Sequence, residues 1–147
     1  MEKQRGPERQ AELLQIIREW QTIEDKGIAQ CTKIIGKTEN PLIRAVAEII
    51  RQDSVTHKKI QQLIIDSFEK EAIHLTPEEL GDIWELIEEH AALEKKSIEL
   101  AEQALERCRL FTTKHLLSYL IDDEKKHDRL MTQLNDFKRG MYPYASG

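Results

Sequence analysis

The chain has 147 residues, of which 33% are charged, 39% hydrophobic and only 5% aromatic. This length suits one domain with a substantial core, and six Gly and four Pro are too few for the frequent turns of an all-β fold. The net charge of −5 excludes the basic footprint of a protein that binds nucleic acid or an anionic membrane. We therefore expect a single all-α domain over residues 1–147, with no nucleic-acid partner and no membrane partner.

The sequence also predicts a cytoplasmic protein. No apolar run approaches the ~18–20 residues of a membrane span, and the first ten residues lack the apolar core of a signal peptide. Cys31 and Cys108 are far apart in the sequence and belong to no Cys-x-x-Cys pair. Two buried thiols in a reducing compartment are therefore expected, rather than a disulfide framework or a metal knuckle.

Helix-breaking residues divide the first half of the chain into two predicted helices. The first begins near Pro7, and Gly36 is a candidate C-terminal cap for it. The second has Asn40 as its N-cap and Pro41 in its first turn, and fades near residues 67–71.

Two further helices are predicted in the second half. The third begins with a capping box in which Thr76 is the N-cap and Glu79 stands three residues later. A break near residues 109–113 precedes the fourth, and residues 140–147 are expected to form a loose tail after an ordered bundle of about 7–139. Four long helices joined by short turns predict a four-helix bundle.

An internal repeat relates the two halves of the chain. A shift of 70 residues aligns them without gaps, and apolar positions keep their phase. The same shift places three polar pairs in register: Glu24 with Glu94, Asp53 with Asp123, and His57 with His127. The repeat predicts two helical hairpins, related by a pseudo-two-fold axis that brings the polar positions together.

Ionisable residues fall on the apolar stripes of all four predicted helices. An unpaired carboxylate on such a stripe costs several kcal/mol, so a metal cation between the helices is the simplest explanation, and a buried hydrogen-bonded layer without metal is the alternative. Carboxylate and imidazole ligands suit iron, manganese or zinc. The candidate metal ligands are Glu24, His57, His90, Glu94, Glu124 and His127.

This pattern resembles the ferritin-like superfamily, and within it the di-iron carboxylate proteins of the rubrerythrin and bacterioferritin type. Their bundles supply one Glu from each of two helices and a Glu-x-x-His motif from each of the other two. Glu24 and Glu94 match the single glutamates, Glu124 and His127 match one motif, and His57 matches the histidine of the other.

The resemblance implies roles for these residues and an activity. Glu124 would bridge two metal ions, Glu24 and Glu94 would be terminal carboxylates, and His57 and His127 would be terminal nitrogen ligands. The implied cofactor is one or two iron ions, with manganese or zinc as alternatives. The implied chemistry is of ferroxidase, peroxidase or oxidase type, with ferrous iron and O2 or H2O2 as substrates.

One departure from the family pattern affects the expected site. Ser54 stands where the first motif has its bridging Glu, and Asp53 points ~100° away around the helix. The site is therefore expected to be lopsided: it would hold one metal, an asymmetric pair with water in place of the carboxylate, or a pair that uses His90. Ser54 also favours a second hypothesis, a non-catalytic metal-binding or degenerate-site protein that acts through association, so whether the chain is an enzyme stays open.

Partners and connectivity follow partly from the resemblance. Two isolated cysteines cannot build the rubredoxin-like module of rubrerythrins, so an external electron donor is expected, and a homodimer is compatible with the family. Ferritin-like bundles need a crossover between the second and third helices. From Ser67 to Thr76 the chain reaches at most ~30 Å. A crossover over residues 68–82, with a helix break at Gly81, and a simple up-down-up-down bundle are therefore both considered.

Overall fold

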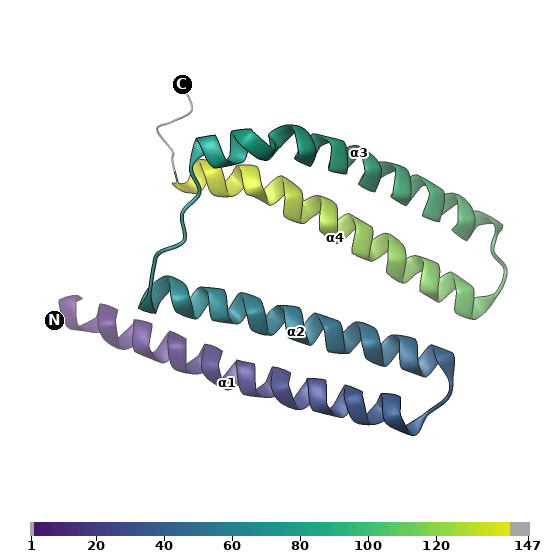
Figure 1. Cartoon of the computed structure of the whole chain (residues 1–147), viewed down its shortest axis with the longest axis horizontal. Coiled ribbons are helices and arrows are strands. Elements are labelled where there is room, and N and C mark those ends of the chain that lie inside the picture. Colours follow the sequence, from purple (N-terminus) through teal and green to yellow (C-terminus); the bar gives the residue numbers. More distant parts are fainter. Residues whose placement is uncertain (1, 142–147) are drawn as a thin grey trace. The chain divides into compact units, whose positions relative to one another are not determined.

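The computed structural model describes residues 2–141. They form α1 (Glu2–Lys37), α2 (Pro41–Glu69), α3 (Pro77–Arg107) and α4 (Phe111–Met141), and no strand occurs among them (Figure 1). The predicted all-α class and the four helices are confirmed, and they are consistent with a four-helix bundle. The predicted tail over residues 142–147 lies outside the described residues. No described helix has an apolar stretch long enough to cross a membrane.

The chain divides into two compact units, residues 1–73 and residues 74–147. In the first unit α1 packs against α2, and in the second α3 packs against α4. Each unit is an antiparallel helical hairpin closed by a short loop (Figure 1). We refer to them as the α1/α2 hairpin and the α3/α4 hairpin.

Side-chain caps fix the start of α2 and α3, as predicted. The Asn40 side chain accepts hydrogen bonds from the backbone N–H groups of Leu42 (3.0 Å) and Ile43 (3.2 Å). At α3 the Thr76 hydroxyl accepts from the Glu79 N–H (3.1 Å), and the Glu79 carboxylate accepts from the Thr76 N–H (2.8 Å). These bonds satisfy donors that the first helical turn leaves without intrahelical partners.

Two boundary predictions were wrong. α1 begins at Glu2 rather than near Pro7, because the φ of proline is already helical and its missing N–H costs only one bond near a helix start. Gly36 lies inside α1, and no described residue has the positive φ of a glycine cap. Of the two connectivities considered, the one with a helix break at Gly81 is not observed. Gly81 lies inside α3, because glycine costs a helix only about 1 kcal/mol.

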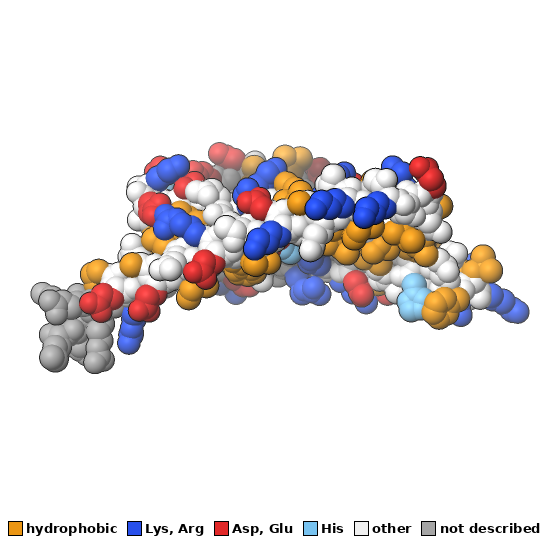
Figure 2. Space-filling view, turned by 90° about the horizontal axis from the view of Figure 1, so that it is seen from below, with side chains coloured by type: hydrophobic (Ala, Val, Ile, Leu, Met, Phe, Trp, Pro, Cys, Tyr) orange, Lys and Arg blue, Asp and Glu red, His pale blue; other side chains and the backbone are white. Residues whose placement is uncertain are grey.

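The core of each hairpin is thin. Leu14, Ile17 and Ile65 form the buried cluster of the α1/α2 hairpin, and Ile87 and Ile121 are among the buried residues of α3 and α4. Many large hydrophobic side chains stay open to solvent on both hairpins, and Figure 2 shows such side chains among charged ones on one face. Each hairpin therefore carries an apolar face that its own two helices do not cover.

Candidate metal centre

Three predicted ligands come together on the α3/α4 hairpin. Glu94 lies near the middle of α3 and is only 4% exposed, and it faces Glu124 and His127 on α4. One potential ligand atom from each of these residues lies within 4.8 Å of the others. This is the carboxylate–carboxylate–imidazole set that the helical spacing predicts, and it suits a divalent transition metal.

The imidazole of His127 lies between two carboxylates. Its Nδ1 is 3.4 Å from Glu94 Oε1, and its Nε2 is 3.4 Å from Asp123 Oδ2, one turn earlier on α4. Histidines that bind metals commonly donate their other ring N–H to such a carboxylate, which sets the tautomer and the ring orientation. Nδ1 is thus the ring nitrogen that faces Glu94, and Asp123 lies against the other ring nitrogen.

The carboxyl groups of Glu94 and Glu124 shift each other's pKa in opposite directions. A hydrogen bond with Glu124 lowers the pKa of Glu94, with the hydrogen bond to His90 acting in the same direction. The same hydrogen bond to Glu94, together with burial, raises the pKa of Glu124. Glu94 Oε2 is buried and accepts no hydrogen bond from an N–H or hydroxyl group. Two adjacent carboxylates cannot both ionise cheaply, so either a proton or a cation is needed there.

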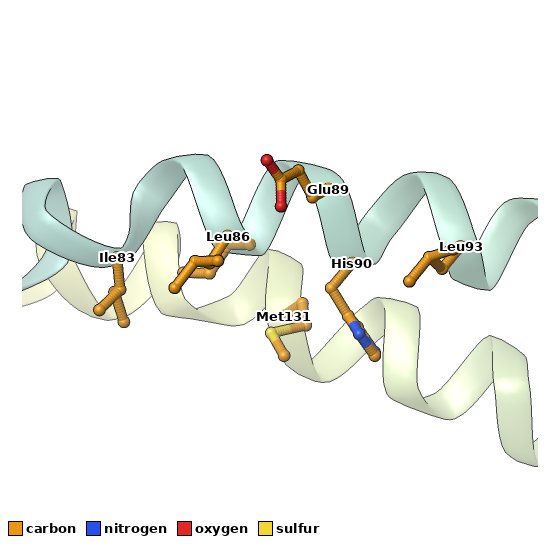
Figure 3. Close-up of a pocket in the computed structure, with 7 residues that line it drawn as sticks. Ile83, Leu86, Glu89, His90, Leu93 and Met131 are labelled. Carbon is orange, nitrogen blue, oxygen red and sulfur yellow. The ribbon is translucent and has the colours of Figure 1, made fainter.

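His90 contacts the same carboxylate from its own helix. Its Nε2 lies 2.7 Å from Glu94 Oε1, the i,i+4 spacing that brings side chains together on one helix face. His90 also lines an apolar groove in which it lies beside Met131 of α4, whereas Glu89 points away (Figure 3). The ring is placed to hold the Glu94 carboxylate in position, and its role as a direct ligand stays a prediction.

The α1/α2 hairpin contains the corresponding histidine–glutamate pair. Glu24 is buried, and His57 Nδ1 lies 3.5 Å from its Oε1. The next residue after each of these also forms a pair: Lys58 Nζ lies 2.7 Å from Asp25 Oδ1. This contact links α1 to α2 at the level of the pair.

Ser54 faces α1 close to this pair. A Cβ atom on Gly27, one turn after Glu24, would lie 3.7 Å from Ser54 Oγ. The serine therefore lies on the inner side of the hairpin, and this hairpin has no carboxylate at the position that Glu124 occupies on α4.

The structure adds one polar residue that the sequence reasoning did not single out. Gln61 is only 3% exposed, and its Nε2 donates to Glu24 Oε1 at 3.4 Å. It lies one turn after His57 on the same face of α2. The only available signal was this spacing, which does not distinguish a buried amide from a solvated one.

The predicted ligands thus form two groups within the described residues. The α3/α4 hairpin brings together Glu94, Glu124 and His127, with His90 against Glu94. The α1/α2 hairpin brings together Glu24 and His57.

The comparisons with known proteins identify no relative of this chain. No protein-family model, curated protein or solved structure matches it. A four-helix all-α chain with a Glu/His cluster is compatible with a ferritin-like bundle.

Proposed function

We propose that this protein is a ferritin-like metal-binding protein that binds iron through Glu94, Glu124 and His127 and supports redox chemistry with O2 or H2O2. Glu24 and His57 are proposed as the corresponding ligands on the α1/α2 hairpin. The observation that carries the proposal is the buried Glu94 carboxylate, whose Oε2 has no N–H or hydroxyl donor and which faces Glu124 and His127. Burying a carboxylate next to a second carboxyl group costs free energy, and a bound cation offsets this cost more completely than one shared proton does.

The donor set fits the proposed metal. Two carboxylates and an imidazole suit iron, manganese or zinc, and no thiolate competes at the site. Bound iron would supply electron transfer to O2 or H2O2. Glu94, Glu124 and His127 would hold the ion, and Asp123 would orient His127. Metal binding would displace the proton that Glu94 and Glu124 share.

Two further features support the proposal. Helix boundaries repeat at the 70-residue shift, since α1 ends at Lys37 and α3 at Arg107, while α2 begins at Pro41 and α4 at Phe111. The His–Glu distances in the two hairpins are 3.5 Å and 3.4 Å. Both features are what two copies of one metal-binding hairpin would have.

The alternative is a non-catalytic metal-binding or degenerate-site protein that acts through association. Ser54 favours it, because the α1/α2 hairpin lacks the carboxylate that Glu124 supplies on α4. The exposed apolar faces are also consistent with a protein that works by binding a partner.

Metal analysis combined with ferrous-iron oxidation tests the proposal. The wild-type chain should bind iron and consume O2 when ferrous iron is added. Glu94→Gln should lose both properties, whereas Glu99→Gln, an exposed position on the same helix, should keep them. Metal binding without O2 consumption would support the non-catalytic metal-binding alternative. No metal binding at all would refute the proposed function and leave the degenerate-site alternative.

A further inference from the structure

Gln61 is an unusual buried residue. Its side chain lies on α2 and is only 3% exposed, yet its carbonyl oxygen Oε1 has no hydrogen-bond partner. Buried amides normally satisfy both ends, because an unpaired polar atom is costly away from water. Met131 occupies the equivalent position on α4, so an apolar side chain of similar size is compatible with this place in a hairpin. Packing alone therefore gives no reason for an amide here.

The neighbours of Gln61 are two candidate metal ligands. Its amide nitrogen lies 3.4 Å from Glu24 Oε1, and His57 Nδ1 lies 3.5 Å from the same oxygen. Two ligands bound about 2.0–2.1 Å from a tetrahedral ion are about 3.3–3.4 Å apart. The separations of His57 Nδ1 and of the Gln61 amide group from Glu24 Oε1 are therefore close to those of a metal ligand shell, although the amide now donates a hydrogen bond there through Nε2.

The amide can present its oxygen to this space. A half-turn about the last side-chain bond exchanges the carbonyl oxygen and the NH2 group of a glutamine at almost no steric cost. A carbonyl oxygen is an accepted ligand for hard and borderline cations. Gln61 follows His57 by one turn, and Ser54 precedes His57 by one turn, so all three lie on one face of α2.

We infer that Gln61 is a metal ligand, and that Glu24, His57 and Gln61 form a divalent-cation site on the α1/α2 hairpin in which the amide oxygen replaces the carboxylate missing at Ser54. The inference rests on the proposed function, because it takes Glu24 and His57 as ligands. It assigns a neutral donor where the α3/α4 hairpin has the anionic Glu124. The α1/α2 site is therefore the weaker of the two for a divalent cation.

Zinc titration of the full-length protein tests the inference, with the side-chain 15N shifts of His57 and His127 read separately. His57 reports the α1/α2 site and His127 the α3/α4 site. Gln61→Met, which copies the residue at 131, should raise the zinc dissociation constant read at His57 by at least about tenfold and change that at His127 less. Gln61→Glu should lower the zinc dissociation constant read at His57. Gln62→Met, an exposed neighbour, is the matched control and should change neither.

The outcomes separate this inference from the proposed function. A His57 affinity unchanged in Gln61→Met, or an equal loss at both histidines, overturns the inference. A zinc response at His127 but none at His57 also overturns it and leaves the α3/α4 site standing. A response at His57 alone, weakened by Gln61→Met, supports the Gln61 site and refutes the proposed α3/α4 site.

Discussion

His127 Nδ1 lies 3.4 Å from the buried Glu94 Oε1, and this contact joins the middle of α4 to the middle of α3. The pair formed by Glu24 and His57 has nearly the same separation, 3.5 Å, on the other hairpin. Each hairpin thus buries a glutamate and places an imidazole nitrogen next to it. The hairpins differ in their third polar group, which is Glu124 on α4 and Gln61 on α2.

Replacing Glu124 with glutamine should weaken metal binding without destabilising the metal-free fold. The amide of Glu124→Gln mimics the protonated carboxyl group that hydrogen bonds to Glu94, so the metal-free variant should have a melting temperature no lower than that of the wild type. Its zinc dissociation constant should rise by at least about tenfold, because an anionic ligand is lost. Asp122→Asn, an exposed position on α4, is the control for the loss of one charge.

The same variant gives a pH test. The pKa of Glu124 is raised, so as pH falls through it the wild-type site gains a proton that competes with the metal, and affinity declines. Glu124→Gln cannot gain a proton at this position. Its zinc affinity should be weaker, and it should not show the decline that Glu124 protonation causes in the wild type. A variant that binds zinc as tightly as the wild type over this range would exclude Glu124 as a ligand.

Local sequence signals predicted the parts of the fold that local interactions determine. Asn40 and Thr76 were recognisable as caps because a cap needs only its own side chain and the next three residues. Glu94, Glu124 and His127 were recognisable because helical spacing places polar residues on an apolar stripe. Gly36 was misread as a helix end, and the alternative with a break at Gly81 is not observed, because a glycine penalty of about 1 kcal/mol is small beside the packing of a long helix.

Gln61 shows where sequence reasoning stops. Its spacing from His57 placed it on the correct face, but many helical glutamines at such positions reach solvent through their long side chains. Whether this amide is buried depends on the rotation of α2 about its axis against α1. That rotation is set by the packing of Ile65 on α2 against Leu14 and Ile17 on α1, which are distant from Gln61 in sequence.

Introducing a carboxylate at position 54 should strengthen the α1/α2 site. Ser54→Glu places an acidic group where Glu124 stands on α4, and Gly27 leaves space opposite it. The variant should bind additional metal or show a lower zinc dissociation constant read at His57. Thr56→Glu adds the same charge at an exposed position of α2 and should have little effect. Equal gains in both variants would indicate general electrostatic attraction rather than coordination.

Alanine at Gly81 should stabilise the protein. Gly81 lies inside α3, and a Cβ atom there would have no neighbouring atom within 4 Å. Gly81→Ala should therefore raise the free energy of unfolding by about 0.5–1 kcal/mol, measured by urea denaturation. Gly27→Ala should give a similar gain, because its Cβ would meet Ser54 Oγ at an ordinary 3.7 Å. A loss of stability in Gly81→Ala alone would mean that α3 bends at this residue.

The capping box of α3 should make stability depend on pH. Hydrogen bonds from Thr76, first of all its backbone N–H, hold the pKa of Glu79 below its ordinary value. The ionised carboxylate therefore stabilises the fold above about pH 4.3, and this contribution is lost as pH falls through the lowered pKa. Thr76→Ala should cost about 1 kcal/mol at pH 7. Glu79→Gln should reduce the difference in unfolding free energy between pH 7 and pH 3, whereas Glu78→Gln should leave it largely intact.

His90 should act on metal binding through Glu94. Its Nε2 is 2.7 Å from Glu94 Oε1, so removing the ring in His90→Leu frees the carboxylate and should raise the zinc dissociation constant read at His127 by about 10–100-fold. His90→Gln keeps a donor at i,i+4 spacing and should recover much of the affinity. Glu89→Gln, whose side chain points away from the groove (Figure 3), is the control. If His90 is instead a direct ligand, His90→Gln should be nearly as weak as His90→Leu, and the His90 ring nitrogens of the wild type should shift on zinc binding as strongly as those of His127.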